Sequence, residues 1–141
     1  MSNQPANQHQ LQDLVAILQE DYQRFPQDQT FEIYAEDVYF KDPLNEFQGV
    51  KRYKKMIAFL SNFFSEIEME VEDISQSVSQ DKNVIKTKWT LNITSPLPWK
   101  PRLSIPGWSE LTVNSENMIS SHIDYWDISP GNVLGQNFNF N

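Results

Sequence analysis

Helical periodicity is confined to the first 64 residues of this chain, and the remainder alternates as β-strands do. Apolar residues recur at three- and four-residue steps from Gln8 to Phe25, which predicts an amphipathic helix that Pro26 ends. A second pattern of this kind predicts a helix from Val50 to Phe64. Helices that precede a run of antiparallel strands form a separate layer, so the order predicts one α+β domain with helices on one side of a bent sheet.

The strand pattern starts between the two helices and resumes after the second. A helical turn at 30–33 leads into a strand at 38–42. Four of the eight prolines fall within 95–107, which predicts an extended arm and excludes a central strand there. The other predicted strands are 66–79 with a bulge near Asp73, 84–94, 108–114 and 118–127.

Length and charge limit the domain plan and the classes of partner. A chain of 141 residues is long enough for one domain with its own core, which we place at 11–128 between a flexible tail at 1–10 and a C-terminal tail at 129–141. The net charge of −8 repels phosphate backbones and anionic bilayers, so we expect neither nucleic acid nor membrane as a partner. The absence of cysteine and of an apolar leader predicts a cytoplasmic protein without disulfides.

Two stretches with polar groups among apolar residues resemble a known superfamily. They are Tyr-Ala-Glu-Asp-Val-Tyr-Phe-Lys-Asp-Pro at 34–43 and Ile-Ser-Ser-His-Ile-Asp-Tyr-Trp-Asp at 119–127. Together with the order of elements, they resemble the nuclear transport factor two-like superfamily, the cone-shaped fold of ketosteroid isomerase, scytalone dehydratase and SnoaL-like polyketide cyclases. The proline arm and the second stretch look most like a SnoaL-like family of unknown function from cyanobacteria and plastids. The resemblance implies a cone-shaped sheet around a pocket.

This resemblance implies roles for several residues. Asp42 matches the proton-shuttling base of ketosteroid isomerases, and Tyr22 is the candidate for the tyrosine that holds their oxyanion. Ser109 stands where those enzymes carry a second acidic donor, so one of their two donors is missing here. Trp126 matches an aromatic residue that lines the isomerase cavity.

Asp42 also has two interpretations from its own setting, at the end of a strand and before a proline. In an apolar hollow, burial raises a carboxyl pKa, which would make Asp42 a usable general base near neutral pH. Alternatively, its carboxylate accepts backbone N–H groups of the following loop and has a structural role. The sequence leaves both interpretations open.

The last strand places His122, Asp124 and Trp126 on one face, because side chains alternate along a strand. His122 and Asp124 are therefore either an acid–base pair or a hydrogen-bonded structural pair. The chain has two histidines, and one of them lies in the N-terminal tail. We accordingly expect no metal site and no cofactor.

The strand before it supplies further residues to the same face. If Val113 pairs with Met118 across the turn, Ser109 lies opposite His122, and Leu111 shares their inward face. The opposite face is too apolar to leave in water, which predicts a homodimer through the outer face of the sheet. That apolar stripe consists of Trp108, Ile119, Ile123 and Tyr125.

Three functions are compatible with this pattern. The first is a domain that binds a hydrophobic small molecule in a pocket lined by Tyr22, Phe40, Ser109, Leu111 and Trp126. The second is a cofactor-independent isomerase, dehydratase or cyclase in which Asp42 is the base and His122 and Asp124 assist. The third is a protein-interaction module whose pocket is filled by its own side chains. The volume of the pocket separates the third from the other two.

Overall fold

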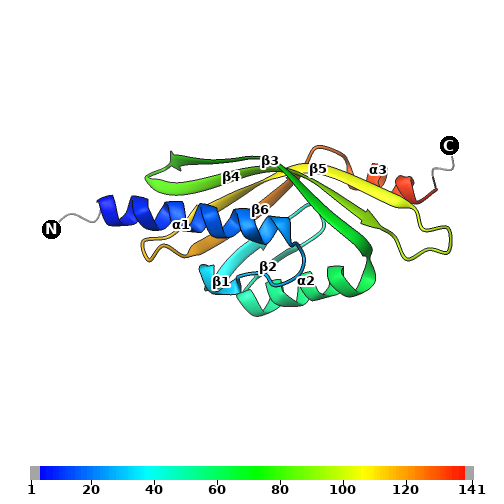
Figure 1. Cartoon of the computed structure of the whole chain (residues 1–141), viewed down its shortest axis with the longest axis horizontal. Coiled ribbons are helices and arrows are strands. Elements are labelled where there is room, and N and C mark those ends of the chain that lie inside the picture. The colour runs from blue at the N-terminus through cyan, green and yellow to red at the C-terminus, as the bar shows by residue number, and fades with distance from the viewer. Residues whose placement is uncertain (1–3, 139–141) are drawn as a thin grey trace.

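The computed structural model describes residues 4–138. Within this range, α1 (Gln4–Gln23) and α2 (Val50–Phe63) lie on one face of a six-stranded sheet (Figure 1). The short elements are α3 (Pro130–Gly135) and the 3-10 helices η1 (Phe31–Ile33) and η2 (Gln136–Phe138). The strands are β1 (Tyr34–Lys41), β2 (Glu46–Gln48), β3 (Ser65–Ser79), β4 (Lys82–Thr94), β5 (Arg102–Val113) and β6 (Ile119–Trp126).

The sheet is mixed, with the strand order β2-β1-β6-β5-β4-β3. β1 and β6 are parallel, and the other neighbouring pairs of described strands are antiparallel. The register between β3 and β4 shifts between Val71 and Asp73, which confirms the predicted bulge. The predicted α+β class, with helices against a bent and mainly antiparallel sheet, is confirmed.

The apolar faces of the two long helices pack on the sheet as their periodicity predicts. Leu11, Leu14 and Leu18 of α1 are buried in one cluster with Tyr53 and Ile57 of α2. Full burial of an apolar side chain of this size contributes roughly 1.5–3 kcal/mol to folding. These contacts hold α1 and α2 over the same face of the sheet.

The first helix is longer than predicted. It starts at Gln4, so residues 4–10 of the predicted tail are helical. Pro5 stands in the first turn, where the N–H group that proline lacks has no partner within the helix in any case. None of the helices in residues 4–138 is long and apolar enough to cross a bilayer.

The proline-rich segment is a central strand for part of its length, which corrects the prediction of an arm over 95–107. β5 begins at Arg102 and pairs with β4 through Pro106, which lies opposite Thr90. The N–H and C=O of a strand residue point to the same side, and the Pro106 carbonyl accepts the Asp127 N–H at 2.8 Å on the β6 side. The N–H that proline lacks would therefore face away from β4, so no hydrogen bond to β4 is lost.

An irregularity in β6 reverses the face of its first residue. Thr112 pairs with Ser121 and Val113 with Ile119, so Ser120 is the extra residue of a bulge. Side chains on the two sides of a bulge no longer alternate in phase. Ile119 is therefore fully buried under the helices, and its predicted place on the outer face is wrong.

The hairpin register also differs from the predicted one. Ser109 lies opposite Asp124, whereas Leu111 lies opposite His122. Val113 pairs with Ile119 and not with Met118, so the connection between paired residues is one residue longer than predicted, and the bulge at Ser120 shifts the register by one more. The predicted pairing of Ser109 with His122 is therefore wrong, although the two residues do share a face.

The last described residues form α3 and η2 against one end of β5, within the segment 129–141 that was predicted as a tail (Figure 1). β6 ends at Trp126, opposite Gly107, so the start of β5 extends beyond it. There the Gln136 side chain accepts the Ser104 N–H at 2.7 Å and donates to the Ser104 carbonyl at 3.1 Å. This amide replaces a neighbouring strand and fixes α3 beside the sheet.

Candidate functional site

A cavity of about 410 Å³ lies between the inner face of the sheet and the helices. Pockets that bind small molecules range from ~300 to ~1,000 Å³, so this cavity is large enough for a ligand. Most of its wall is apolar, and α3 contributes the buried Val133. Other apolar residues of the wall are Leu18, Ile57, Leu60, Leu91, Ile93 and Ile105. A cavity of this size favours the binding and enzyme hypotheses over the interaction module, for which a packed interior was expected.

One line of hydrogen bonds crosses the sheet side of this cavity. The Trp89 indole N–H donates to Ser109 Oγ at 2.8 Å, and the Ser109 hydroxyl donates to Asp124 Oδ1 at 2.5 Å. His122 Nε2 lies 2.8 Å from the same carboxylate oxygen. All four residues line the cavity. Side chains from three adjacent strands thus form one connected line that ends on the Asp124 carboxylate, whose Oδ1 is contacted by Ser109 and His122.

The contact of His122 with Asp124 distinguishes the two ring nitrogens. A neutral imidazole that bonds to this carboxylate donates through Nε2–H and leaves a lone pair on Nδ1. Nδ1 is buried and has no hydrogen-bond partner among the described residues. The ring centroids of Phe40 and Tyr53 lie 5.1 and 5.5 Å from that of His122 and hold the imidazole in place. His122 Nδ1 is therefore an unpaired position enclosed by these rings, and a ligand group reaches it only when they move aside.

Three tyrosine hydroxyls add donors to the same region. The hydroxyl of Tyr22 lies 2.8 Å from Thr87 Oγ1. Burial raises the pKa of Tyr22, Tyr34 and Tyr53 above the ordinary tyrosine value. These hydroxyls consequently keep their protons at physiological pH and can donate hydrogen bonds.

Asp42 lines the cavity as well, but its carboxylate is already engaged by the turn that follows β1. Asp42 Oδ1 accepts the backbone N–H groups of Leu44 at 2.8 Å and Asn45 at 2.6 Å. Burial raises the pKa of Asp42, and these hydrogen bonds oppose that shift. The geometry therefore shows the structural role that the sequence left open, in which Asp42 caps the following turn by accepting its backbone N–H groups. A base role for Asp42 stays a prediction.

Asp42→Asn is expected to retain most of the stability of the folded state, and Asp42→Ala is expected to lose about 1–2 kcal/mol. The asparagine oxygen can still accept both N–H groups, whereas alanine leaves them without this acceptor. A raised pKa means that the uncharged carboxyl favours folding, and this contribution is lost as pH rises through the raised value. Asp42→Asn should therefore gain stability relative to wild type as the pH rises above about 4. Denaturant melts across this pH range check both expectations, and equal losses in the two variants would contradict the capping role.

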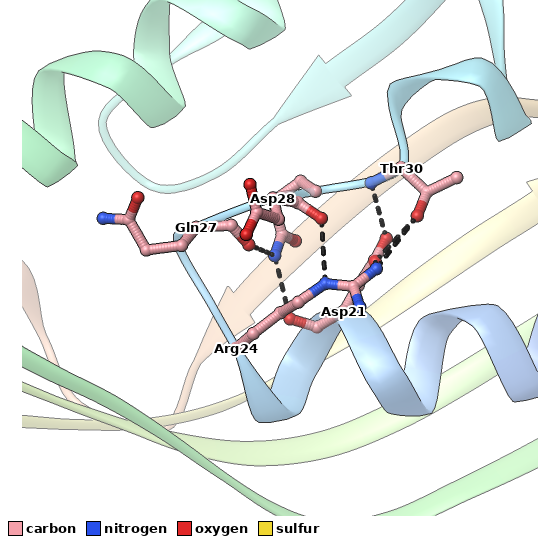
Figure 2. A network of polar contacts seen from close by, with 6 residues as sticks. Asp21, Arg24, Gln27, Asp28 and Thr30 are labelled. Carbon is pink, nitrogen blue, oxygen red and sulfur yellow. Dashed lines mark hydrogen bonds and ion pairs between the residues drawn. The ribbon is translucent and has the colours of Figure 1, made fainter.

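The end of α1 is anchored by a buried carboxylate that the sequence analysis missed. Asp21 is 4% exposed and accepts the Thr30 N–H at 3.0 Å and the Thr30 hydroxyl at 2.9 Å. Arg24 donates to the same carboxylate at 2.8 Å (Figure 2). This network fixes the loop after α1 and with it the adjacent Tyr22, which lines the cavity.

The structure brings together most of the predicted site. The cavity is lined by Tyr22, Phe40, Asp42, Ser109, His122, Asp124 and Trp126. Leu111 is the exception, because it is fully buried in the core cluster beneath α1. Its predicted role in ligand binding, like the roles of the other residues, stays a prediction. Among the described residues, no group of three or more metal-ligating side chains is found.

The cavity wall also includes residues that sequence reasoning did not assign to a site. One of them is Trp89 of β4, and nothing in the sequence indicated its bond to Ser109. The half-buried residues of α2 and the buried Val133 of α3 line the wall as well. The helical periodicity of α2 could have indicated which of its residues face the sheet. α3 has six residues, which is too short for a periodicity of this kind.

Comparisons with known proteins concern the family and the fold of this chain. The family model described as uncharacterized conserved protein DUF2358 matches residues 12–122. None of the curated proteins matches this chain.

Among solved structures, the chain is similar to IdmH from Streptomyces antibioticus, a proposed polyketide cyclase. The two are 17% identical with a TM-score of 0.69, over 93% of this chain and 100% of IdmH. An LEH-like epoxide hydrolase of M. tuberculosis is 12% identical with a TM-score of 0.65, over 91% and 89% of the two chains. A ketosteroid isomerase-like protein from Catenulispora acidiphila is 14% identical with a TM-score of 0.66, over 86% and 89%. These likenesses show the nuclear transport factor two-like fold, as predicted from the sequence.

Proposed function

We propose that this chain, which belongs to the family of uncharacterized conserved proteins whose model matches residues 12–122, binds a neutral and mainly apolar small molecule that carries a hydroxyl group. The observation behind the proposal is the cavity of about 410 Å³, in which apolar walls surround one line of polar groups. A site of this kind gains affinity from buried apolar surface and orients its ligand through a few polar contacts.

The charges around the cavity favour a neutral ligand. No lysine or arginine is among the described residues that line it, so an anionic ligand would be desolvated without a partner. The three carboxylates that line the cavity are already engaged, Asp124 by Ser109 and His122, Asp42 by its turn, and Asp21 by Thr30 and Arg24. A cation would therefore have to compete with these hydrogen bonds.

The hydroxyl preference follows from the acceptor on His122. Its Nδ1 is buried and has no partner among the described residues, and an unpaired buried acceptor costs about 1–3 kcal/mol. Nδ1 has almost no accessible surface, so binding has to shift the rings of Phe40 and Tyr53 away from it. A ligand hydroxyl that then donates to Nδ1 removes this cost, whereas a methyl ether of the same shape cannot donate. The ether should therefore bind more weakly than the alcohol.

Calorimetric titration with 2-naphthol and 2-methoxynaphthalene tests this function. We expect the alcohol to bind about tenfold more tightly than the ether. Asp124→Ala removes the acceptor of His122 Nε2 and should reduce this ratio to about threefold or less. Asp127→Ala, which removes an exposed carboxylate paired with Lys88 outside the cavity, is the matched control and should keep the ratio. Equal affinities of the wild type for the two compounds, or no binding of either, would contradict the proposal.

We also propose that the outer face of the sheet forms a homodimer. Trp108 and Tyr125 stack there with ring centroids 4.2 Å apart, and Ile123 lies beside them on the same face. Two ion pairs flank this stripe, Lys86 with Glu110 and Lys88 with Asp127. The surface beside the stripe therefore carries both positive and negative charges, so basic groups of one copy can face acidic groups of a second copy related by a two-fold axis. Sedimentation of the wild type at micromolar concentration should show a dimer, and a monomer there would overturn this proposal.

A further inference from the structure

Large apolar side chains are exposed where the cavity reaches the surface. Phe59 and Phe63 of α2 are 57% and 47% exposed and also line the cavity. Their rings stack with centroids 5.0 Å apart. Leu134 of α3 is 65% exposed and Leu44 of the β1–β2 turn is equally exposed, and both line the same cavity. The opening is thus bordered by apolar groups from three different parts of the chain.

A second aromatic pair adjoins this border. The exposed rings of Trp99 and Phe138 lie 6.0 Å apart, and the Trp99 indole N–H donates to the carbonyl of Asn137, which lines the cavity. Trp99 lies in the turn between β4 and β5, at the same end of the molecule as α3 (Figure 1). We define the apolar rim as Leu44, Phe59, Phe63, Trp99, Leu134 and Phe138.

The helix that carries Phe59 and Phe63 is basic, unlike the chain as a whole. α2 carries Lys51, Arg52, Lys54 and Lys55, and none of the nineteen acidic residues lies between Phe47 and Ser65. These four basic residues are exposed, although the net charge of the protein is −8. Lys55 lies one helical turn before Phe59, so basic and aromatic side chains share one exposed helix face.

We propose that the apolar rim docks on the surface of an anionic lipid bilayer, with the basic residues of α2 at the headgroups and the cavity opening toward the lipid. Exposed aromatic and apolar residues beside lysines are the composition that binds at such an interface. Each basic residue near an anionic surface contributes about fivefold in affinity, which corresponds to about 1 kcal/mol. The net charge of the whole chain predicted no membrane partner. That net charge does not show that the basic residues are concentrated on α2.

A second copy of the chain is a poorer occupant of the rim. Two-fold contact through the rim would place the basic clusters of both copies in one interface. Like charges would then oppose the apolar contact, whereas anionic lipid neutralises them. A docked rim would also let an apolar ligand pass from lipid into the cavity without crossing water.

Flotation with vesicles tests the proposal without any ligand, so its outcome is independent of the proposed function of the cavity. The wild type should bind vesicles that contain phosphatidylserine and phosphatidylcholine, and should bind pure phosphatidylcholine at least tenfold more weakly.

The double variant Phe59→Ser with Phe63→Ser should lose at least tenfold in partitioning. Lys51→Gln with Lys55→Gln should lose roughly 25-fold, from about fivefold for each residue. Val78→Ser, which removes an apolar side chain that is 71% exposed and outside the cavity lining, is the matched control and should partition like wild type.

Three results would overturn the proposal. The first is the absence of wild-type binding to the anionic vesicles. The second is binding that the Phe59 and Phe63 changes leave intact. The third is a dimer in sedimentation that the same changes convert to monomer while vesicles bind nothing, which would assign the rim to contact between copies.

Discussion

Gly107→Ala is expected to destabilise the protein by about 3 kcal/mol or more, because β5 has no room for a side chain at this position. A Cβ atom here would lie 2.4 Å from the Tyr125 carbonyl oxygen and 2.8 Å from an atom of the Trp89 ring. The first contact is with the backbone of a paired strand, which cannot move without breaking the β5–β6 ladder. The second would displace the indole that donates to Ser109 at the start of the polar line.

Urea unfolding of Gly107→Ala beside Gly131→Ala checks this prediction. Gly131 lies in α3, and a Cβ there would meet no atom within 4 Å. Its replacement should leave stability unchanged or raise it by up to about 1 kcal/mol, because alanine loses less backbone freedom than glycine on folding. A loss below about 1 kcal/mol for Gly107→Ala would show that β5 and β6 can separate there, contrary to the packing described.

Leu91→Trp is expected to abolish ligand binding, with at least a hundredfold loss in the affinity for 2-naphthol. Leu91 lies on β4 between the buried Trp89 and Ile93, and its side chain is half-buried in the cavity wall. A tryptophan at this position extends into the cavity and occupies volume that the ligand needs. Because the added surface is apolar and enters an apolar space, the variant should be at least as stable as wild type.

The control for this variant is Val78→Trp, which adds a ring at a position that is 71% exposed and outside the cavity lining. It should bind 2-naphthol like wild type. Calorimetry measures both affinities, and thermal melts establish that Leu91→Trp is folded. Full binding by a folded Leu91→Trp would place the ligand elsewhere on the protein.

Periodicity predicted the helices and most strands because burial on one face is a local property of the sequence. α2 and β4 carry uninterrupted patterns, and both lie where expected. β5 was missed over its first half because its prolines argue against a central strand when the neighbouring strands are unknown. Pro106 is accommodated because its nitrogen faces away from β4, and this depends on the pairing of three strands.

The part of the site that could be predicted is the part that depends on the alternation of side chains along one strand. Alternation placed His122, Asp124 and Trp126 on one face, and all three line the cavity. The bond from Ser109 to Asp124 depends on a register that the bulge and the longer turn determine, and neither is marked in the sequence. The partners of Asp21 are likewise tertiary, since Thr30 reaches it only after the chain has turned back at the end of α1 (Figure 2).

A crystal structure of the wild type grown with 2-naphthol tests the central claim most directly. The account predicts the naphthalene ring inside the cavity against Leu91 and Ile105, with its oxygen within hydrogen-bond distance of His122 Nδ1. It also predicts that His122 Nε2 stays bonded to Asp124. Naphthol bound on the outer face of the sheet, or a cavity closed by its own side chains, would contradict it.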